Sequence, residues 1–435
     1  MQTTIEFGES FLHFVWQHKA FELQNLATTE GAPIEILDAG RLNKHAGADF
    51  SEAKIYIDGL LWVGDVEIHL RASDWLNHGH SSDAAYERVI LHVVFEADVP
   101  IRYADGREIP VFVLSGRVAE KLVISYKSLI NNTNWVACAA HLPIDLPAEA
   151  RENWLADLGL ERLEAREEII KQQLQATQND WNELLYWGIA QALGGEVNGA
   201  AMLALAQSLP LLTLYKHRHN LAQIEALLFG QAGMLPLPPQ KDNKYLYLLQ
   251  REYEYLRRKY QLKPINAAYW RFSRMRPANF PTIRIAQLAQ LILQSEHLFA
   301  NLIAGKDLQR TKRIFKLKLH SYWDNRYLLE EESEAVQPKS LGKSTVGIIF
   351  INAVLPLMFA YGDLRLRPDL RRKAILWFLE LPAENNFFID KWLSLGITAQ
   401  NAFETQALLH LHRHYCTPRR CLACAIGRCL LQPDA

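Results

Sequence analysis

The hydrophobic pattern begins with a helix and then changes to strands. Between residues 10 and 21, apolar side chains recur every three or four positions, which predicts an N-terminal helix. From Ile34 to about Leu114, the pattern shifts to five short β-rich runs: IEIL, AKIYI, LLWVGDVEIHLRA, VILHVVFEA and IPVFVLSG. Between the third and fourth runs, SSDAAYERV predicts a second helix, with Ser82 or Asp83 as its N-cap. The predicted order is helix, three strands, helix, two strands.

The pattern after residue 138 predicts a different kind of domain. The segment AAHLPIDLPAEA has two prolines and no clear period, so we interpret residues 139–150 as a linker. Beyond it, runs such as ENWLADLGLERLEAREEIIKQQL have helical spacing, and no strong strand signal follows. The sequence therefore predicts an α+β protein. It has a mixed-sheet domain over 1–138, a mainly α-helical domain over 151–410 and a Cys-rich segment over 411–435.

Composition narrows the class of protein. The 435 residues are 49% apolar and 22% charged, which is typical of a soluble globular protein. Basic and acidic residues number 47 and 48, so nucleic acid could be bound only through a local basic patch. The start, MQTTIEFGESF, has no signal-peptide pattern. The apolar run at 346–361 is too short and too interrupted to span a membrane. We expect a cytoplasmic protein and a buried helix or helix pair at 346–361.

Polar residues in the predicted hairpin indicate a metal site. Asp58-Gly59 predicts a two-residue type I′ turn, and Glu67 and His69 then share one face of their strand. Without a bulge, Asp49 faces the other side. One extra residue at Gly64 would pair Asp49 with His69, so we expect a bulge there and convergence of the three side chains. Two close carboxylates repel each other unless a cation such as Mg²⁺ or Mn²⁺ lies between them.

The same residues resemble a known nuclease motif. Ala48-Asp49, seventeen further residues and then Glu67-Ile68-His69, together with the order of elements, resemble the PD-(D/E)XK, or restriction-endonuclease-like, superfamily. The resemblance implies a metal-dependent nuclease or phosphodiesterase that acts on nucleic acid. Asp49 and Glu67 would hold the metal, and His69 would orient or activate water. This chain has Ala48 in place of the usual Pro, and His69 in place of the usual Lys.

Other interpretations of the hairpin stay open. Asp49 could cap a turn, while Glu67 pairs with Lys54 or Arg71. Glu9 matches an extra acid that some members of that superfamily carry, but an acid also suits the start of a helix.

Two further histidines, His78 and His80, follow the hairpin. They could complete a zinc or manganese site with Glu67 and His69, which would indicate a different metallohydrolase. The alternative is that they are surface-loop or half-buried histidines.

A cysteine cluster lies near the end of the chain. The spacing Cys416-x4-Cys421-x2-Cys424-x4-Cys429 predicts one structural metal centre tied to the helical domain. Two x4 loops around a single CxxC favour a [4Fe–4S] cluster over Zn²⁺. The string resembles the cluster loop of the endonuclease III type of base-excision glycosylase. Alternatively, Cys429 is a buried thiol and His412 or His414 is the fourth ligand, or all four cysteines are free and buried.

Arginine-rich segments supply candidate nucleic-acid contacts. Arg274, Arg276 and Arg284 interleave with aromatic residues, and Arg419 and Arg420 lie within the cysteine cluster. Arginines paired with acids at a Pro-bounded helix junction are the alternative for the first group. The competing function is a non-catalytic protein that binds nucleic acid or a protein partner on the same nuclease-like fold.

Over nearly its full length, the chain resembles an uncharacterised bacterial family of unknown function. The strings GDVEIHLRASDW, YERVILHVVFEAD, RPANFP and CLACAIG carry this resemblance. It implies no activity.

Overall fold

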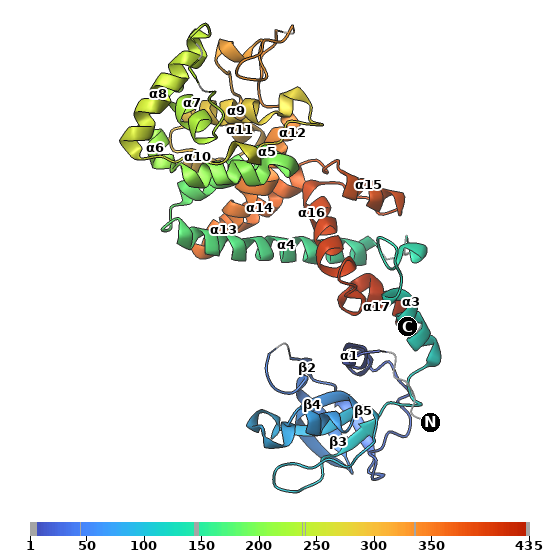
Figure 1. Ribbon diagram of the computed structural model, residues 1–435. Coiled ribbons are helices and arrows are strands. Elements are labelled where there is room, and N and C mark those ends of the chain that lie inside the picture. Colours follow the sequence, from blue (N-terminus) through green and yellow to red (C-terminus); the bar gives the residue numbers. More distant parts are fainter. Residues whose placement is uncertain are drawn as a thin grey trace. The chain divides into compact units, whose positions relative to one another are not determined.

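The computed structural model describes residues 7–43, 45–142, 148–236, 238–239, 241–334 and 336–431, with the backbone alone at 148–150. The chain divides into two compact units (Figure 1). The first contains the described residues of Met1–Pro147, Leu395–Ile397 and Leu411–Ala435, and the second those of Ala148–Ser394 and Thr398–His410. Of the predicted linker, residues 143–147 lie outside the described residues.

A mixed sheet forms the framework of the first unit (Figure 1). Its strands run in the order β1-β3-β4-β5-β6, with β2 paired to β3. Pairs β1–β3 and β3–β4 are antiparallel, whereas β4–β5 and β5–β6 are parallel. The strands are β1 (Ile34–Asp38), β2 (Arg41–Leu42), β3 (Phe50–Ile57), β4 (Leu60–Arg71), β5 (Val89–Glu96) and β6 (Val111–Val113). All but β2 fall on the five predicted runs.

Helix α1 (Glu9–Gln17) covers one face of the sheet. Its buried side chains Phe11 and Val15 share a core with Val66 and Ile68 of β4. Because side chains alternate along a strand, the intervening Glu67 points to the other face of β4. The local pattern of β4 therefore separates the apolar core from the polar site.

The β3–β4 hairpin has the predicted turn but a different bulge. Asp58 and Gly59 have φ values of 51° and 75°, as a type I′ turn requires. Pairing is regular up to Ala53–Gly64, and the next pair is Phe50–Val66. The extra residue therefore lies in β3, at Ser51–Glu52, where Glu52 has a φ of 60°. The predicted bulge at Gly64 is wrong.

Gly64 has another structural role. Asp65 N donates to Arg88 O at 2.8 Å, which draws the start of β5 against β4. A Cβ atom on Gly64 would lie 2.4 Å from Ile90 Cγ2 and 2.6 Å from Arg88 O. Glycine is needed here because the neighbouring backbone passes so close.

The crossover from β4 to β5 lacks the predicted helix. It contains α2 (Asp74–Asn77) and two 3₁₀ turns, η1 (His80–Ser82) and η2 (Ala84–Tyr86), in place of a helix over SSDAAYERV. Asp83 does cap η2, because its side chain accepts a hydrogen bond from Ala85 N at 2.9 Å. The string has too few apolar side chains to bury a face, so it makes a single turn.

The end of the chain belongs to the first unit, so the expected tie to the helical domain is wrong. Leu431 is buried in the same core as α1, and the Trp135 and His412 rings stack at 4.4 Å. The elements involved are α3 (Glu120–Ile130), η3 (Ala139–His141), η9 (His412–Cys416), η10 (Cys421–Ala423) and α17 (Ala425–Leu431).

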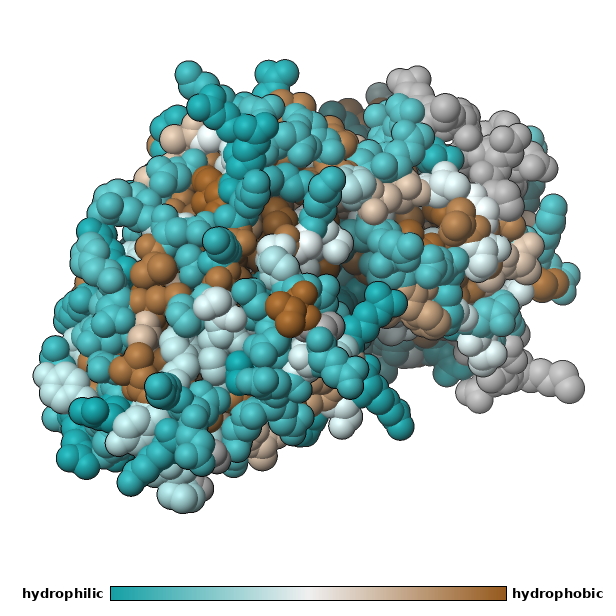
Figure 2. All heavy atoms as spheres, turned by 90° about the horizontal axis from the view of Figure 1, so that it is seen from above, coloured by the Kyte–Doolittle hydropathy of each residue, from teal (hydrophilic) through white to brown (hydrophobic). Residues whose placement is uncertain are grey.

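The described residues of the second unit form helices and connecting loops without a β-strand, and they enclose a large apolar core. On the face drawn in Figure 2, hydrophobic residues form small clusters within a mostly hydrophilic surface. The α-helices are α4 (Ala148–Ala176), α5 (Trp181–Ser208), α6 (Leu211–Tyr215), α7 (Leu221–Gln231), α8 (Lys244–Tyr260), α9 (Pro281–Gln294), α10 (Leu298–Ala304), α11 (Leu308–Lys312), α12 (Lys343–Ile349), α13 (Leu355–Leu364), α14 (Pro368–Glu380), α15 (Phe387–Ser394) and α16 (Ala402–Leu411).

The apolar run at 346–361 lies within one continuous helix. Helices α12 and α13 join through the π-helical turn η8 (Phe350–Val354). Pro356 has no N–H to donate to Asn352 O, and this oxygen accepts a hydrogen bond from Arg166 Nη2 at 2.7 Å instead. By length and composition, Lys343–Leu364 could cross a membrane, but 72% of its most apolar window is buried within the protein. It is therefore a core helix, as the interruptions at Asn352 and Pro356 predict.

Replacing Gly64 by Ala tests the close approach of β5. The added Cβ must displace Ile90 and the Arg88 carbonyl, so we expect the first unit to lose about 1–3 kcal/mol of stability. Hydrogen–deuterium exchange of the β4 and β5 amides measures this loss. Gly8→Ala is the control, because nothing lies within 4 Å of the added Cβ. Equal exchange in the two variants would contradict this role of Gly64.

Candidate metal centre

Asp49 and Glu67 are held together by reciprocal hydrogen bonds. Asp49 N donates to Glu67 Oε2 at 3.0 Å, and Ile68 N donates to Asp49 Oδ2 at 3.0 Å. The bulge at Ser51–Glu52 places Asp49 in this position. The structure therefore places Asp49 against Glu67 and Ile68 of β4, through a register that differs from the prediction.

The acids repel one another. Burial, then the charge of Asp49, raises the pKa of Glu67 to about 8, and Glu9 on α1 adds to this rise. Burial and then Asp49 also raise the pKa of Glu9. The alternative partner Arg71 pairs with Glu96 instead, with Nε–Oε2 at 3.5 Å. Among the described residues, neither Lys nor Arg forms an ion pair with Glu67, so a bound cation would relieve the repulsion.

Three histidines lie beside Glu67. Their ligand atoms lie within 4.8 Å of one another: His69 comes from β4, and His78 and His80 come from the crossover. Glu67 Oε1 lies 3.4 Å from Nε2 of both His69 and His80. Gly79, with a φ of 72°, turns the chain between His78 and His80 so that both reach the same place.

His92 on β5 orients His69 from behind. The two rings are joined by His69 Nδ1 and His92 Nε2, which lie 2.8 Å apart. If His69 Nδ1 carries the proton, this proton is donated to His92, and Nε2 is left with a lone pair that lies 3.1 Å from His78 Nδ1 and 3.4 Å from Glu67 Oε1. Burial, then His78 and His80, lowers the pKa of His69 to about 4. The ring is therefore neutral near pH 7, which is the form that binds a metal.

Three ring nitrogens in this region are buried and lack a hydrogen-bond partner: His13 Nε2, His80 Nε2 and His92 Nδ1. His13 Nε2 lies 3.2 Å from Asp49 Oδ2, and His80 Nε2 lies 3.4 Å from Glu67 Oε1, yet neither contact has hydrogen-bond geometry. In each contact the nitrogen and the oxygen lie close together without a hydrogen bond, as they would if both pointed toward a third atom between them. The sequence analysis missed His13, although it follows Glu9 by four residues and therefore lies on the same face of α1.

A pocket of about 390 Å³ opens beside the histidines. His80 and Trp75 form part of its wall, and the Tyr86 ring stacks on His80 at 3.8 Å.

The other predicted site residues are more dispersed. Arg284 lies buried in the helical unit and donates to Gln287 Oε1 at 2.8 Å and Asn279 Oδ1 at 2.7 Å. It therefore cannot contact nucleic acid, and that prediction is wrong. Arg274 and Arg276 are exposed in the same unit.

The residues of the cysteine segment differ in their exposure to solvent. Arg420 is exposed, and Arg419 is half-buried. Cys416 and Cys424 are buried and Cys421 is half-buried, whereas Cys429 is exposed.

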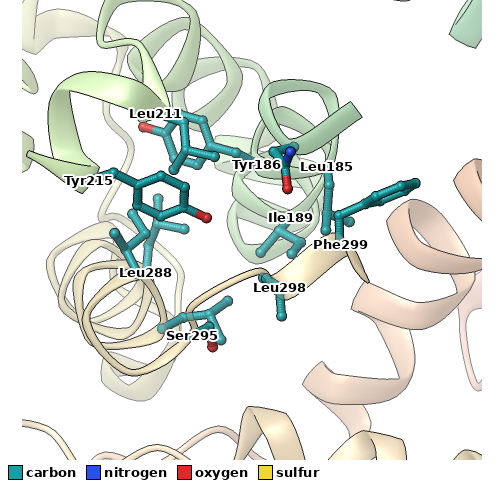
Figure 3. A pocket seen from close by; sticks show the side chains of 12 residues that line it. Leu185, Tyr186, Ile189, Leu211, Tyr215, Leu288, Ser295, Leu298 and Phe299 are labelled. Carbon is teal, nitrogen blue, oxygen red and sulfur yellow. The ribbon is translucent and has the colours of Figure 1, made fainter. Parts of the chain in front are cut away.

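The helical unit contains a small apolar cavity between α5, α6, α9 and α10 (Figure 3). Leu185, Ile189 and Leu288 form part of its lining. The cavity has a volume of about 20 Å³, room for one water molecule, which could hydrogen-bond the buried and unpartnered Tyr186 hydroxyl. It is too small to be a substrate site.

Together, the fold and the site define a two-unit α+β protein with a candidate metal centre in its sheet unit. A family model matches residues 9–387, so the chain belongs to the family described as "Protein of unknown function (DUF2851)". The match covers α1, the hairpin and the histidines, and it ends before the cysteine segment. No curated protein and no solved structure matches the chain.

Glu67→Gln tests the electrostatics of the metal-free site. Because folding raises the pKa of Glu67 from 4.5 to about 8, the folded chain keeps a proton that the unfolded chain loses between those pH values. The contribution of Glu67 to the free energy of unfolding therefore falls as pH rises from 4.5 to about 8. Near pH 4.5 the variant and the wild type should differ little. By about pH 8 the metal-free variant should be more stable by about 4 kcal/mol.

Urea unfolding at several pH values measures this difference. Glu52→Gln is the control, because its side chain is exposed on β3 and should show no such trend. A difference that does not change with pH would contradict a buried, protonated Glu67.

Proposed function

We propose that the first unit is a divalent-metal-dependent hydrolase that cleaves phosphodiester bonds of nucleic acid. One observation carries the proposal: Glu67 Oε1 lies 3.4 Å from Nε2 of both His69 and His80, and no described Lys or Arg forms an ion pair with Glu67. Asp49 joins this group from the β3 side through its hydrogen bonds to β4.

The donor set favours particular metals. Carboxylate oxygens alone suit Mg²⁺, whereas imidazole nitrogens beside them favour Mn²⁺ or Zn²⁺. Glu67, His69, His78 and His80 would hold the ion, with Asp49 adjacent. In this assignment His69 is a ligand rather than the residue that orients water.

A bound ion would supply an activated water and neutralise charge that develops on the phosphate. The residues of this chain prepare the site for such chemistry. His92 fixes the orientation of the His69 ring, and the reciprocal bonds fix both carboxylates. Trp75 and Tyr86 pack around His80, so the donor nitrogens are positioned before an ion arrives.

The substrate class rests on the resemblance to the PD-(D/E)XK superfamily. The antiparallel hairpin that carries Asp49 and Glu67, followed by a parallel β5, supports it. The short crossover, without the helix that the resemblance implies, is a departure. Exposed Arg274, Arg276 and Arg420 remain the candidate phosphate contacts.

Purified protein tested against single- and double-stranded DNA and RNA checks the proposal. We expect cleavage with Mn²⁺ or Zn²⁺, none with EDTA, and a loss of at least about 100-fold in Glu67→Gln. Calorimetry should show weaker Mn²⁺ binding in the same variant. Glu52→Gln should behave like the wild type.

Three outcomes would contradict the proposal. Unchanged cleavage by Glu67→Gln would remove Glu67 from the site. Nucleic-acid binding without cleavage in any metal would favour the non-catalytic binding protein instead. Cleavage of other esters but not of phosphodiesters would favour a different metallohydrolase built on the histidines.

A further inference from the structure

Four thiols from two distant parts of the chain meet in the first unit. Cys138 directly precedes η3, while Cys416 ends η9, Cys421 begins η10 and Cys424 precedes α17. The two segments are joined by a hydrogen bond from Arg419 Nη2 to Asn134 O at 2.7 Å. Cys138 and Cys421 pack against the same apolar core. The sequence spacing alone does not reveal Cys138, because nearly the whole helical unit separates it from the others.

Electrostatics support this proximity. Burial, then the charges of Cys424 and Cys421, raises the pKa of Cys138 to about 11. Burial, then Cys424, Cys138 and Cys421, also raises the pKa of Cys416. Cys429 lies on the exposed side of α17 and is not part of this group.

Hydrogen-bond donors surround the thiols. The backbone N–H groups of Ile426 and Gly427 donate to the Cys424 sulfur. Arg419 Nη1 is shielded from solvent and has no hydrogen-bond partner. Burial raises the pKa of Cys138, Cys416 and Cys421, and the positive charge of Arg419 opposes this rise at all three. A cationic side chain with an unpartnered N–H among these thiols is suited to an anionic ligand with sulfur acceptors.

The spacing of the sulfur atoms distinguishes a single zinc ion from an iron–sulfur cluster at this site. A tetrahedral zinc ion with Zn–S bonds of about 2.3 Å would hold its sulfur atoms about 4 Å apart. Among the described residues, only the histidine group has three ligand atoms within 4.8 Å of one another, so the thiols are spread more widely than zinc requires. An iron–sulfur cube separates its cysteine sulfurs further, because four iron atoms lie between them.

We propose that Cys138, Cys416, Cys421 and Cys424 bind a [4Fe–4S] cluster, with Arg419 as its charged hydrogen-bond donor. The chain takes up an assembled cluster from a thiolate donor: four Fe–S bonds to the donor break and four to this chain form, the four S–H protons pass to the released thiolates, and the oxidation state of the cluster is unchanged. The cluster joins the segment around Cys138 to the end of the chain, and its binding energy contributes to folding of the first unit. This site is independent of the proposed hydrolase.

Cys138→Ser and Cys429→Ser form the matched pair of variants for the test. Anaerobically purified wild type should contain about four iron and four sulfide per chain and absorb broadly in the visible range. Cys429→Ser should match it. Cys138→Ser should lose the absorption and at least about fivefold of the iron, even after reconstitution with an assembled cluster.

Alkylation of the wild-type protein covers the case in which Cys138→Ser does not fold. Before cluster removal, iodoacetamide should modify Cys429 alone. After removal by an oxidant and a chelator, it should also modify the four ligands.

Three results would overturn the assignment. Iron kept by Cys138→Ser and lost by Cys429→Ser would restore the ligand set expected from the sequence. About one zinc per chain without sulfide would replace the cluster by a single ion. Wild type free of metal and sulfide after reconstitution would show that these are buried thiols.

Discussion

The reciprocal hydrogen bonds between Asp49 and β4 are the constraint on which the candidate metal centre depends. They fix one carboxylate from each strand of the hairpin at a place where water is largely excluded and Glu67 is only 5% exposed. Two charges cannot share such a place without cost. The metal-free protein avoids the cost by keeping Glu67 protonated near pH 7. A divalent cation would remove the cost by displacing that proton, and the proposed function depends on this exchange.

The rest of the first unit holds this arrangement in place. The bulge at Ser51–Glu52 positions Asp49, and Gly64 lets β5 approach β4 so that His92 lies behind His69. Helix α1 buries its apolar face on the opposite side of the sheet. Its polar residues interact with Asp49 instead: Glu9 through charge repulsion, and His13 through a contact of 3.2 Å between Nε2 and Oδ2. One short helix therefore contributes both to the core and to the site.

The sequence predicts the strands, the type I′ turn and the convergence of Asp49, Glu67 and His69, because period-2 patterning and turn chemistry are local. It does not predict the bulge, because Glu52 adopts a positive φ that its side chain does not favour. Arg284 was expected at the surface, but the fold satisfies its guanidinium in the interior. Cys138 could not be predicted as a neighbour of the other thiols, because only the folded first unit brings the two segments together.

The most direct test of the metal centre is anomalous X-ray diffraction from crystals grown with Mn²⁺. The account predicts a single strong peak in the first unit, within coordination distance of Glu67 Oε1 and of Nε2 of His69 and His80. A crystal saturated with Mn²⁺ that shows no peak there, with Glu67 and the histidines unchanged, would contradict it.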